Sequence, residues 1–443
     1  MTKRIVKIQG FIIVFLTVVL PAFSQSNPNP STSVDAFIQS EMNTQHFPGV
    51  STVIVKDDKI VWINSYGFAD VANTIPVSDT TVFLMASVSK VFTGTAAMQL
   101  YENNVINLDG DVNQYLPWLL QIPGYPNDTI SFRQLMTHTS SIQDNWAAMV
   151  GYYGYPDPTI TLDDCMQRYF STSGSDYNAS ANFLATAPGS VFQYSNIATA
   201  LNGYLVERAS GIPFDQYCNI NIFNKLCMNK TRWYYSNFNP NDVAIPYHYS
   251  GNNYVAYPQY GFADYPDGQL RSNVTDLANF MIAYLNGGTF GTNSILSPAS
   301  INQMWTVQFP SLNTRQGLNW YKEVLYYNGG SAWVWGHNGG ESGVSTEIYL
   351  DPVNKIGLCV LSNGEGNGLN ICDQLYNYAL SLNASSGYSP ACLTTGIAET
   401  TTDIKRKVIK IIDLLGRESP LKTNTPLIKI FSDGSAEKFF IID

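Results

Sequence analysis

The chain has 443 residues, a formal net charge of −10 and only 13% charged residues. An acidic chain lacks the basic surface that neutralises phosphates, which argues against a nucleic-acid-binding protein. The length suffices for one large or two medium domains with a well-filled core, and the composition suits a protein outside the cell with a small or neutral substrate.

The N-terminus has the pattern of a secretory signal peptide. A basic start precedes an apolar run at 11–20, and Ala22 and Ser24 place small residues at the −3 and −1 positions of a cleavage site. We therefore predict a signal peptide over residues 1–24 and a secreted or cell-surface protein. A membrane anchor is the alternative, but the run is short for a bilayer span, and no other window is apolar enough to cross one.

A β-hairpin and a buried helix are the first elements expected. Segments rich in β-forming residues at 50–55 and 60–66 flank a polar turn at 56–59. From residue 87 to about residue 102, apolar residues recur on nearly all sides of a helix, a pattern typical of a helix inside a large core.

The rest of the main domain alternates irregular and regular segments. Residues 130–235 mix helical stretches with loops, and 237–266 is expected to form long loops or irregular strands. Strands at 345–350 and 356–362 and a helix at 369–382 follow. This order predicts an α+β fold in which an antiparallel sheet, assembled from both ends of the domain, is flanked by helices.

The composition changes after the main domain, which we assign to residues 25–382. Residues 383–402 are rich in Ser, Thr, Gly and Ala and are predicted to be a linker. Residues 403–443 are predicted to be a small C-terminal β module, with a hairpin turn at Asp433. Its expected strands are 407–412, 427–431 and 438–442.

Cysteine and histidine spacing gives no sign of a metal site. Cys218 and Cys227 are close enough in sequence to close a small disulfide loop in an oxidising compartment, and the rest of the connectivity stays open. There is no C-x-x-C, and the four histidines are far apart, so we expect neither a metal nor a cofactor. The six cysteines are Cys165, Cys218, Cys227, Cys359, Cys372 and Cys392.

Ser87 and Lys90 form a Ser-x-x-Lys pair at the start of the predicted buried helix. The spacing recurs twice in the C-terminal tail, but side chains at i and i+3 face each other only on a helix. Lys90 shares a face with Ser87, whereas the adjacent Ser89 lies about 100° away. To accept a proton near neutral pH, Lys90 needs a pKa well below roughly 10.4, and burial can lower it. The alternative is a helix-capping serine beside an exposed lysine.

Two further segments have a defined context. Tyr194 and Asn196 follow a Pro-Gly turn and open a helical run, although Tyr-x-Asn is a common spacing in this tyrosine-rich chain. His337, Gly339 and Gly340 precede the late strands, where glycines let a substrate backbone lie close to a sheet edge. The alternative for His337 is a turn histidine whose hydrogen bonds are satisfied.

These motifs, in this order, resemble those of the penicillin-recognising serine hydrolases. The family comprises class C β-lactamases, D-alanyl-D-alanine carboxypeptidases, D-aminopeptidases and related esterases. The resemblance covers roughly residues 33–382 and implies a β-lactamase/transpeptidase-like fold with a mainly helical region beside the sheet. The matching segments are 47–50, 66–70, 87–90, 135–140, 194–196, 336–340 and 361–363.

The resemblance also assigns roles to the motif residues. It implies that Ser87 is the acylated nucleophile and that Lys90 and Tyr194 share the general acid/base work. It further implies that Asn196 contacts the substrate amide and that the backbone N–H groups of Ser87 and Gly340 form the oxyanion hole.

The motifs at His337 and His138 each differ from the usual family sequence at one position or more. His337 stands in a His-Asn-Gly motif where β-lactamases usually carry Lys-Thr-Gly, as it does in several peptidases and esterases of the family. A mostly neutral imidazole binds a carboxylate less strongly than an ammonium, which argues against efficient β-lactam hydrolysis. His138 lies in a motif that we interpret as structural, and Ser141 replaces the glycine usual three residues later.

The tail resembles a second family, the C-terminal sorting domains of proteins exported by the Bacteroidetes type IX secretion system. The likeness is carried by residues 408–418 and 427–442. It implies export across the outer membrane with the type IX secretion machinery as a partner. An adhesive or structural β module is the alternative.

The sequence therefore predicts a secreted serine hydrolase that cleaves an amide or ester through an acyl-enzyme at Ser87. Its substrate would be a small molecule or a peptide, including a cell-wall peptide, and no stable membrane span is expected. The alternatives are a small-ester esterase of the same fold and a catalytically silent surface-binding protein. The tyrosine-rich segments 151–157 and 247–265 are candidates for the cleft walls, with ordinary loop packing as the alternative.

Overall fold

The computed structural model describes residues 26–390, 408–412, 426–431 and 436–440. The chain divides into two units, with the boundary between residues 391 and 392. The predicted signal peptide, residues 1–24, lies outside the described residues. None of the described helices is long and apolar enough to cross a bilayer.

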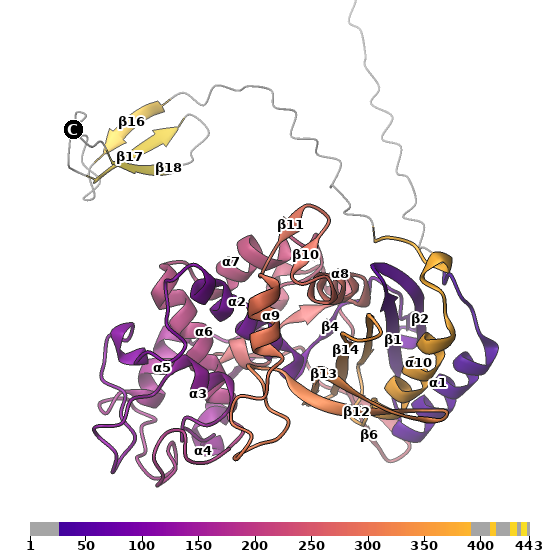
Figure 1. The fold of residues 1–443 in the computed structure, drawn as a ribbon, viewed down its shortest axis with the longest axis horizontal. Coiled ribbons are helices and arrows are strands. Elements are labelled where there is room, and N and C mark those ends of the chain that lie inside the picture. Colours follow the sequence, from indigo (N-terminus) through magenta and orange to yellow (C-terminus); the bar gives the residue numbers. More distant parts are fainter. Residues whose placement is uncertain (1–25, 391–407, 413–425, 432–435, 441–443) are drawn as a thin grey trace, which may run out of the picture. The chain divides into compact units, whose positions relative to one another are not determined.

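A seven-stranded antiparallel sheet forms the frame of the first unit (Figure 1). The early strand β1 pairs with the late strand β15, with Val50 opposite Ser362 and Lys56 opposite Ile356. The sheet is thus assembled from both ends of the domain, which confirms the prediction from sequence. Across the sheet the order is β12 (Tyr321–Tyr327), β13 (Gly330–Glu341), β14 (Val344–Asp351), β15 (Ile356–Ser362), β1 (Gly49–Lys56), β2 (Lys59–Asp70) and β3 (Ile75–Pro76).

The sheet is covered on both faces, because successive residues of a strand point to opposite sides. Val50 and Ile54 of β1 belong to a core with helices α1 (Thr32–Gln45) and α10 (Leu369–Ser381). Val53, between them, belongs to the larger core on the other face. The strand is therefore buried on both faces, from Gly49 to Val55.

The larger core belongs mainly to a helical region that stands beside the sheet (Figure 1). Helix α8 packs on β1 and β15, whereas α3, α5 and α7 pack on α6. The helices of this region are α2 (Ser89–Glu102), α3 (Phe132–Met136), α4 (Trp146–Met149), α5 (Leu162–Phe170), α6 (Asn196–Ser210), α7 (Phe214–Cys218), α8 (Val274–Leu285) and α9 (Pro298–Met304).

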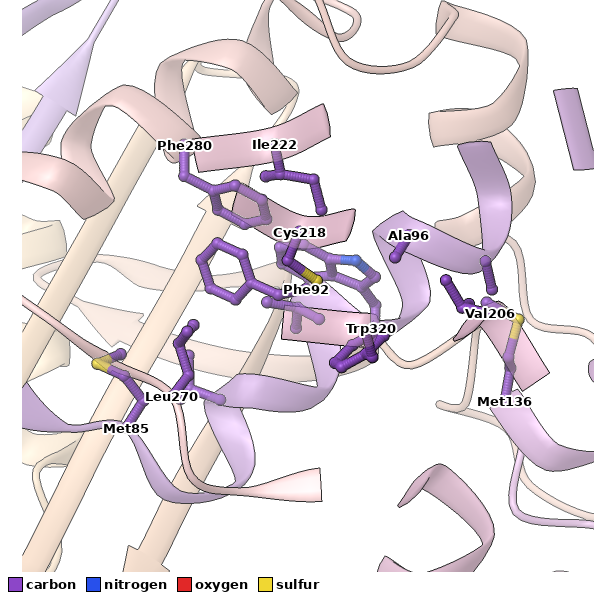
Figure 2. Packing of buried hydrophobic residues seen from close by; sticks show 14 of the residues in the cluster. Met85, Phe92, Ala96, Met136, Val206, Cys218, Ile222, Leu270, Phe280 and Trp320 are labelled. Carbon is purple, nitrogen blue, oxygen red and sulfur yellow. The ribbon is translucent and has the colours of Figure 1, made fainter. Parts of the chain in front are cut away.

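Helix α2 runs through the middle of this core, as its all-round apolar pattern predicts. Every residue from Ser89 to Leu100 is buried. Phe92 stacks on Phe280 of α8 with ring centroids 4.1 Å apart, and Figure 2 shows the two rings next to each other, near Ile222 and Cys218. A helix enclosed in this way is a rigid base for the residues at its N-terminus.

Short two-stranded β ladders connect the loops near the N-terminus of α2. Strand β4 (Phe83–Leu84) pairs with β9 (Arg271–Ser272), and β5 (Tyr153–Gly154) pairs with β8 (Gly261–Phe262). These pairings bring three segments that are distant in sequence to the N-terminus of α2. Two further ladders lie elsewhere, β6 (Tyr247–Ser250) with β7 (Asn253–Ala256) and β10 (Thr289–Phe290) with β11 (Asn293–Ser294).

Two expectations need correction. Cys218 is a free thiol while Cys227 is disulfide-bonded, so the small 218–227 loop does not form. The first part of the predicted linker, residues 383–402, is attached to the sheet: Ile60 and Tyr388 exchange backbone hydrogen bonds of 2.9 and 3.1 Å. The remaining linker residues from 391 lie outside the described part of the chain.

The second unit contains a three-stranded antiparallel sheet in the order β16–β17–β18. Ile428 pairs with Ile412 on one side and with Lys438 on the other. The strands are β16 (Val408–Ile412), β17 (Pro426–Phe431) and β18 (Ala436–Phe440), close to the three predicted from sequence. The predicted turn at Asp433 lies outside the described residues.

Candidate active site

Ser87 lies in the 3₁₀ turn Ala86–Val88, directly before α2. Its neighbour Ala86 is buried and has φ of 44°, a left-handed conformation that is unfavourable for alanine and that residues at functional sites often adopt. Lys90 follows one turn later and donates a 2.9 Å hydrogen bond from Nζ to Ser87 Oγ. Ser89 Oγ instead accepts the backbone N–H of Leu270, so Ser87 is the serine that faces the lysine.

Lys90 is fully buried and makes three hydrogen bonds. Besides Ser87, Nζ donates to Asn196 Oδ1 and to the backbone carbonyl of Asp267, both at 2.7 Å. Burial pushes the pKa of Lys90 down, but the charges of Tyr194 and Asp267 outweigh it and leave the pKa above its ordinary value. The prediction that burial lowers this pKa is therefore wrong in its net direction.

Tyr194 and Asn196 are brought to the same point by helix α6. Ser195 caps the helix by accepting the N–H of Ala198 at 3.1 Å, which sets Tyr194 just before the first turn and Asn196 within it. Tyr194 donates from its hydroxyl to Ser87 Oγ at 3.1 Å. The ammonium of Lys90 lies 5.2 Å from the centre of the Tyr194 ring.

Asp144 holds the N-terminus of α6 in place, a role that the sequence reading missed. Its carboxylate accepts hydrogen bonds from Ser195 Oγ at 3.0 Å and from the backbone N–H groups of Asn196 and Ile197 at 3.1 Å. It also accepts Asn196 Nδ2 at 2.9 Å, which turns Asn196 Oδ1 toward Lys90. An acidic residue suits the positive end of the helix dipole, but its local sequence carries no signal that it meets this helix.

Gly339 and Gly340 lie on β13, whose end runs along the serine turn. A Cβ on Gly339 would stand 2.5 Å from the carbonyl oxygen of Met85 and 3.0 Å from the backbone nitrogen of Ser87, so only glycine permits this approach. A Cβ on Gly340 would meet nothing within 4 Å. Thr346 Oγ1 on β14 donates to the same Met85 carbonyl at 2.7 Å and fixes the turn against the sheet.

His337 lies within β13 and is buried, so it is not the turn histidine that was the alternative. Burial, aided by the charge of Lys90, lowers its pKa to about 3, and the imidazole is therefore neutral. Its Nδ1 is 2.6 Å from the carbonyl oxygen of Asn338, and because a carbonyl only accepts, Nδ1 carries the proton. The ring lies between Tyr194 and Tyr321, with centroids at 6.3 and 5.2 Å.

His138 supports the site from behind. Its Nδ1 accepts the backbone N–H of Ser195 at 3.2 Å, and its ring lies 4.4 Å from the ring of Tyr194. Burial holds the pKa of His138 well below its usual value. These contacts agree with a structural motif that orients Tyr194.

Two cavities flank Ser87. The first, which we call the acidic cavity, has a volume of about 230 Å³ and is lined by Asp264, Asp267 and Glu341 together with Trp146. The second, which we call the Arg315 groove, has a volume of about 400 Å³ and is lined by Arg315 together with Phe192, Tyr321, His337 and Asn338. Ser87, Tyr194 and Gly340 line both, whereas Asn196 lines the acidic cavity.

The tyrosine-rich segments contribute less to these walls than expected. From 151–157 Tyr153 lines the acidic cavity, and from 247–265 Phe262 and Asp264 do so. Tyr249 instead stacks on His46, with ring centroids 3.8 Å apart. Within the described residues no group of three or more His, Cys, Asp or Glu side chains is arranged to hold a metal ion.

Comparison with known proteins agrees with this architecture. A sequence model described as Beta-lactamase matches residues 34–381. Protein flp of Staphylococcus aureus is 25% identical over 331 residues, which are 74% of this chain and 62% of that protein, so the chain spans less than two thirds of that relative's length.

Two solved structures show the same fold. The octameric penicillin-binding protein homologue from Pyrococcus abyssi has a TM-score of 0.63 at 22% identity, over 92% of this chain and 89% of that one. A class C β-lactamase has a TM-score of 0.62 at 20% identity, over 79% of this chain and 96% of that one.

Proposed function

Since the chain belongs to the β-lactamase family and has its serine-hydrolase fold, we propose that it cleaves an amide or ester bond through an acyl-enzyme at Ser87. The observation that carries the proposal is the convergence of Lys90 Nζ and Tyr194 OH on Ser87 Oγ, at 2.9 and 3.1 Å. A serine that merely caps a helix has no need of a buried lysine and a tyrosine on one oxygen.

Acylation needs a group that takes the Ser87 proton. Lys90 is held as an ammonium by its raised pKa, which leaves the Tyr194 oxygen, 3.1 Å from Ser87 Oγ, as the acceptor. Ser87 Oγ then bonds to the substrate carbonyl carbon, and the bond to the leaving nitrogen or oxygen breaks as Tyr194 returns the proton to it. Water repeats the sequence to release the acid and free Ser87.

The developing negative charge on the carbonyl oxygen needs donors fixed beforehand. We assign these donors to the backbone N–H groups of Ser87 and Gly340. The close approach that Gly339 permits between β13 and the serine turn supports this assignment. Asn196, held by Lys90 and Asp144, is placed to contact a substrate amide from the acidic cavity.

We propose that the substrate is a D-amino-acid-containing peptide such as a cell-wall peptide. A β-lactam and a small ester are the alternatives. Neutral His337 in place of a lysine favours peptide or ester over efficient β-lactam hydrolysis. Turnover of a D-alanyl-D-alanine peptide, a chromogenic cephalosporin and a p-nitrophenyl ester, measured side by side, ranks the three.

Covalent labelling tests the proposal directly. The protein is incubated with a fluorophosphonate or with penicillin, and the adduct is located by mass spectrometry. We expect the adduct on Ser87, its loss in Ser87→Ala, and its retention in the matched variant Ser89→Ala. A folded protein that takes no adduct on Ser87 would be the catalytically silent surface-binding protein instead.

We also propose that the protein is secreted or held at the cell surface, with its last forty residues as a type IX sorting domain. Support comes from the signal-peptide pattern of residues 1–24 and from the separate three-stranded sheet of the second unit. Deletion of residues 403–443 should retain the protein in the cell, and unchanged export would refute the sorting role. Sequencing the mature N-terminus should find residues 1–24 removed.

A further inference from the structure

The acidic cavity contains two carboxylates that are almost fully buried. The exposed fraction is 3% for Asp264 and 5% for Asp267, and both residues line the cavity beside Ser87. Among the described residues, neither carboxylate forms an ion pair or accepts a hydrogen bond from another side chain. Buried carboxylates are ordinarily paired or strongly hydrogen-bonded, because an isolated buried charge is costly.

Lys90 does not supply the missing partner. Its three hydrogen bonds go to Ser87 Oγ, to Asn196 Oδ1 and to the backbone carbonyl of Asp267, and none goes to a carboxylate. Burial raises the pKa of Asp264 to about 7, and burial together with the charge of Asp264 raises the pKa of Asp267 well above its usual range. The charge of Lys90 opposes this rise in both carboxyls without reversing it, so the pair has a cation nearby but none in direct contact.

The other walls of the cavity suit a positive organic group. Trp146, Tyr153 and Phe262 present aromatic rings, whose faces attract cations. Glu341 adds a third carboxylate and is oriented by the Tyr153 hydroxyl, which donates to its Oε2 at 3.0 Å. A metal ion is a poorer fit, because the described residues hold no cluster of three or more potential ligands.

We propose that the acidic cavity binds a protonated amino group of the substrate, so that the protein acts on amides or esters that carry an ammonium group next to the bond being cleaved. The inference rests on the proposed function, since it concerns the same serine. The amino group has two sources, the acyl part or the leaving part of the substrate. The experiment separates them.

The test compares two probes of equal shape and different charge. Aminobutyl and pentyl phosphonofluoridates differ by an ammonium in place of a methyl group, and both report the rate of adduct formation on Ser87. We expect the aminobutyl probe to react about tenfold to a hundredfold faster, the range given by hydrogen bonds to charged groups. Equal rates, or a faster pentyl probe, overturn the inference and leave the proposed function intact.

Variants assign the preference to the carboxylates. Asp267→Asn and Asp264→Asn should each reduce the ratio of the two rates to about threefold or less, while Asp242→Asn, whose carboxylate pairs with Lys230 outside both cavities, should keep it. The melting temperature of the two cavity variants should not fall, because each replaces a buried carboxyl that forms no ion pair. A large fall with an unchanged ratio would show that the carboxylates serve the fold and would overturn the inference.

A second probe pair identifies the source of the amino group. Ampicillin carries an ammonium on its acyl side chain, and benzylpenicillin lacks it. Faster acylation by ampicillin places the ammonium on the acyl part, in agreement with a faster aminobutyl probe, whose alkyl group stays on phosphorus when fluoride leaves. Faster acylation by a 4-aminobutyl ester than by the pentyl ester of the same acid places the ammonium on the leaving part. Absence of any adduct with every probe would defeat the proposed function, and the inference with it.

Discussion

The two cavities that flank Ser87 differ in how their charges are held. In the acidic cavity Asp264 and Asp267 are almost fully buried and have no cationic partner among the described residues. In the Arg315 groove the Arg315 side chain is 49% exposed, and its guanidinium lies 3.2 Å from Glu323 Oε1, with its carbon 5.2 Å from the centre of the Trp333 ring. The carboxyls of the acidic cavity are buried and form no ion pair, whereas the guanidinium of the Arg315 groove is solvent-exposed and forms one.

This difference bears on which cavity selects the substrate. A charge in a buried site interacts strongly because little water screens it, whereas an exposed ion pair contributes little and weakens with salt. The acidic cavity should therefore dominate discrimination by charge, and the Arg315 groove should add a smaller, salt-dependent preference for an anionic group. Ser87 and Tyr194 line both cavities, so replacing either residue should slow the reaction of cationic and anionic substrates equally.

Replacing Lys90 should have the largest effect and should not distinguish the cavities. Lys90→Met removes the donor to Ser87 Oγ and leaves Asn196 Oδ1 and the Asp267 carbonyl unpaired. We expect labelling of Ser87 to slow by about a thousandfold for cationic and neutral probes alike, within the range of general acid–base catalysis. Stopped-flow or timed mass spectrometry measures the rates.

The control for this variant is Lys322→Met. The ammonium of Lys322 lies over the Trp335 ring at 5.2 Å and lines neither cavity. Its replacement should leave both labelling rates within about twofold, as for a surface change. A Lys90→Met protein that lost only its reaction with cationic probes would show that Lys90 acts on substrates in the acidic cavity alone.

Alanine substitutions at Gly339 and Gly340 of β13 should distinguish the effect of displacing Ser87 from the effect of reshaping a cavity. Gly339→Ala forces a Cβ against the Met85 carbonyl and the backbone nitrogen of Ser87, so the serine turn must move. A displacement of this size costs roughly a hundredfold in rate with any probe. Gly340→Ala places its Cβ in open space, and the loss should be much smaller and should depend on the probe. Similar losses for both variants would contradict this account.

Arg315→Gln should have a modest effect on the groove side. An exposed ion pair is worth up to about 1 kcal/mol, which corresponds to about fivefold. We expect a loss of that size for a substrate with a free carboxylate and no loss for its methyl ester. The difference should shrink at high salt. Arg133→Gln, whose partner Asp109 is remote from both cavities, is the matched control.

The elements that the sequence predicted are those with a local signal. Runs of β-forming residues around a polar turn marked β1 and β2, all-round apolarity marked α2, and the i, i+3 rule chose Ser87 over Ser89 as the partner of Lys90. The pairing of β1 with β15 followed from the order of strands and helices. Apart from this pairing, which joins distant parts of the chain, each of these features is determined by a short stretch of sequence.

The acids of the site had no such signal. Asp144 lies in a loop and meets the N-terminus of α6 through hydrogen bonds alone. Asp264 and Asp267 lie between β8 and β9, whose pairing with β5 and β4 accompanies their position beside Ser87. The net direction of the Lys90 pKa depends on these same neighbours and was misjudged from burial alone. Residues 383–388 looked like a linker because a single bridge to Ile60 leaves no pattern in composition.

The smallest expected effect is a change of labelling rate with pH. It distinguishes the two cavities because a different group titrates in each. Asp264 has a pKa of about 7 and faces Asp144, Lys90 and Glu341, whereas His337 has a pKa of about 3 and stays neutral above pH 5. As pH rises through 7 the Asp264 carboxyl ionises, so attraction for an ammonium group should increase. An alkylammonium probe keeps its own charge over this range.

We therefore expect the ratio of aminobutyl to pentyl labelling rates to rise about twofold to threefold between pH 6 and pH 8. The rise is smaller than the tenfold of a complete charged contact because the aromatic rings of Trp146, Tyr153 and Phe262 attract the probe at both pH values. Asp264→Asn should abolish the rise, and His337→Gln should retain it, because the imidazole contributes no charge at either pH. A rise that vanished with His337→Gln and survived Asp264→Asn would move the titrating group from the acidic cavity to the Arg315 groove, and the contrast between the two sides of Ser87 would be reversed.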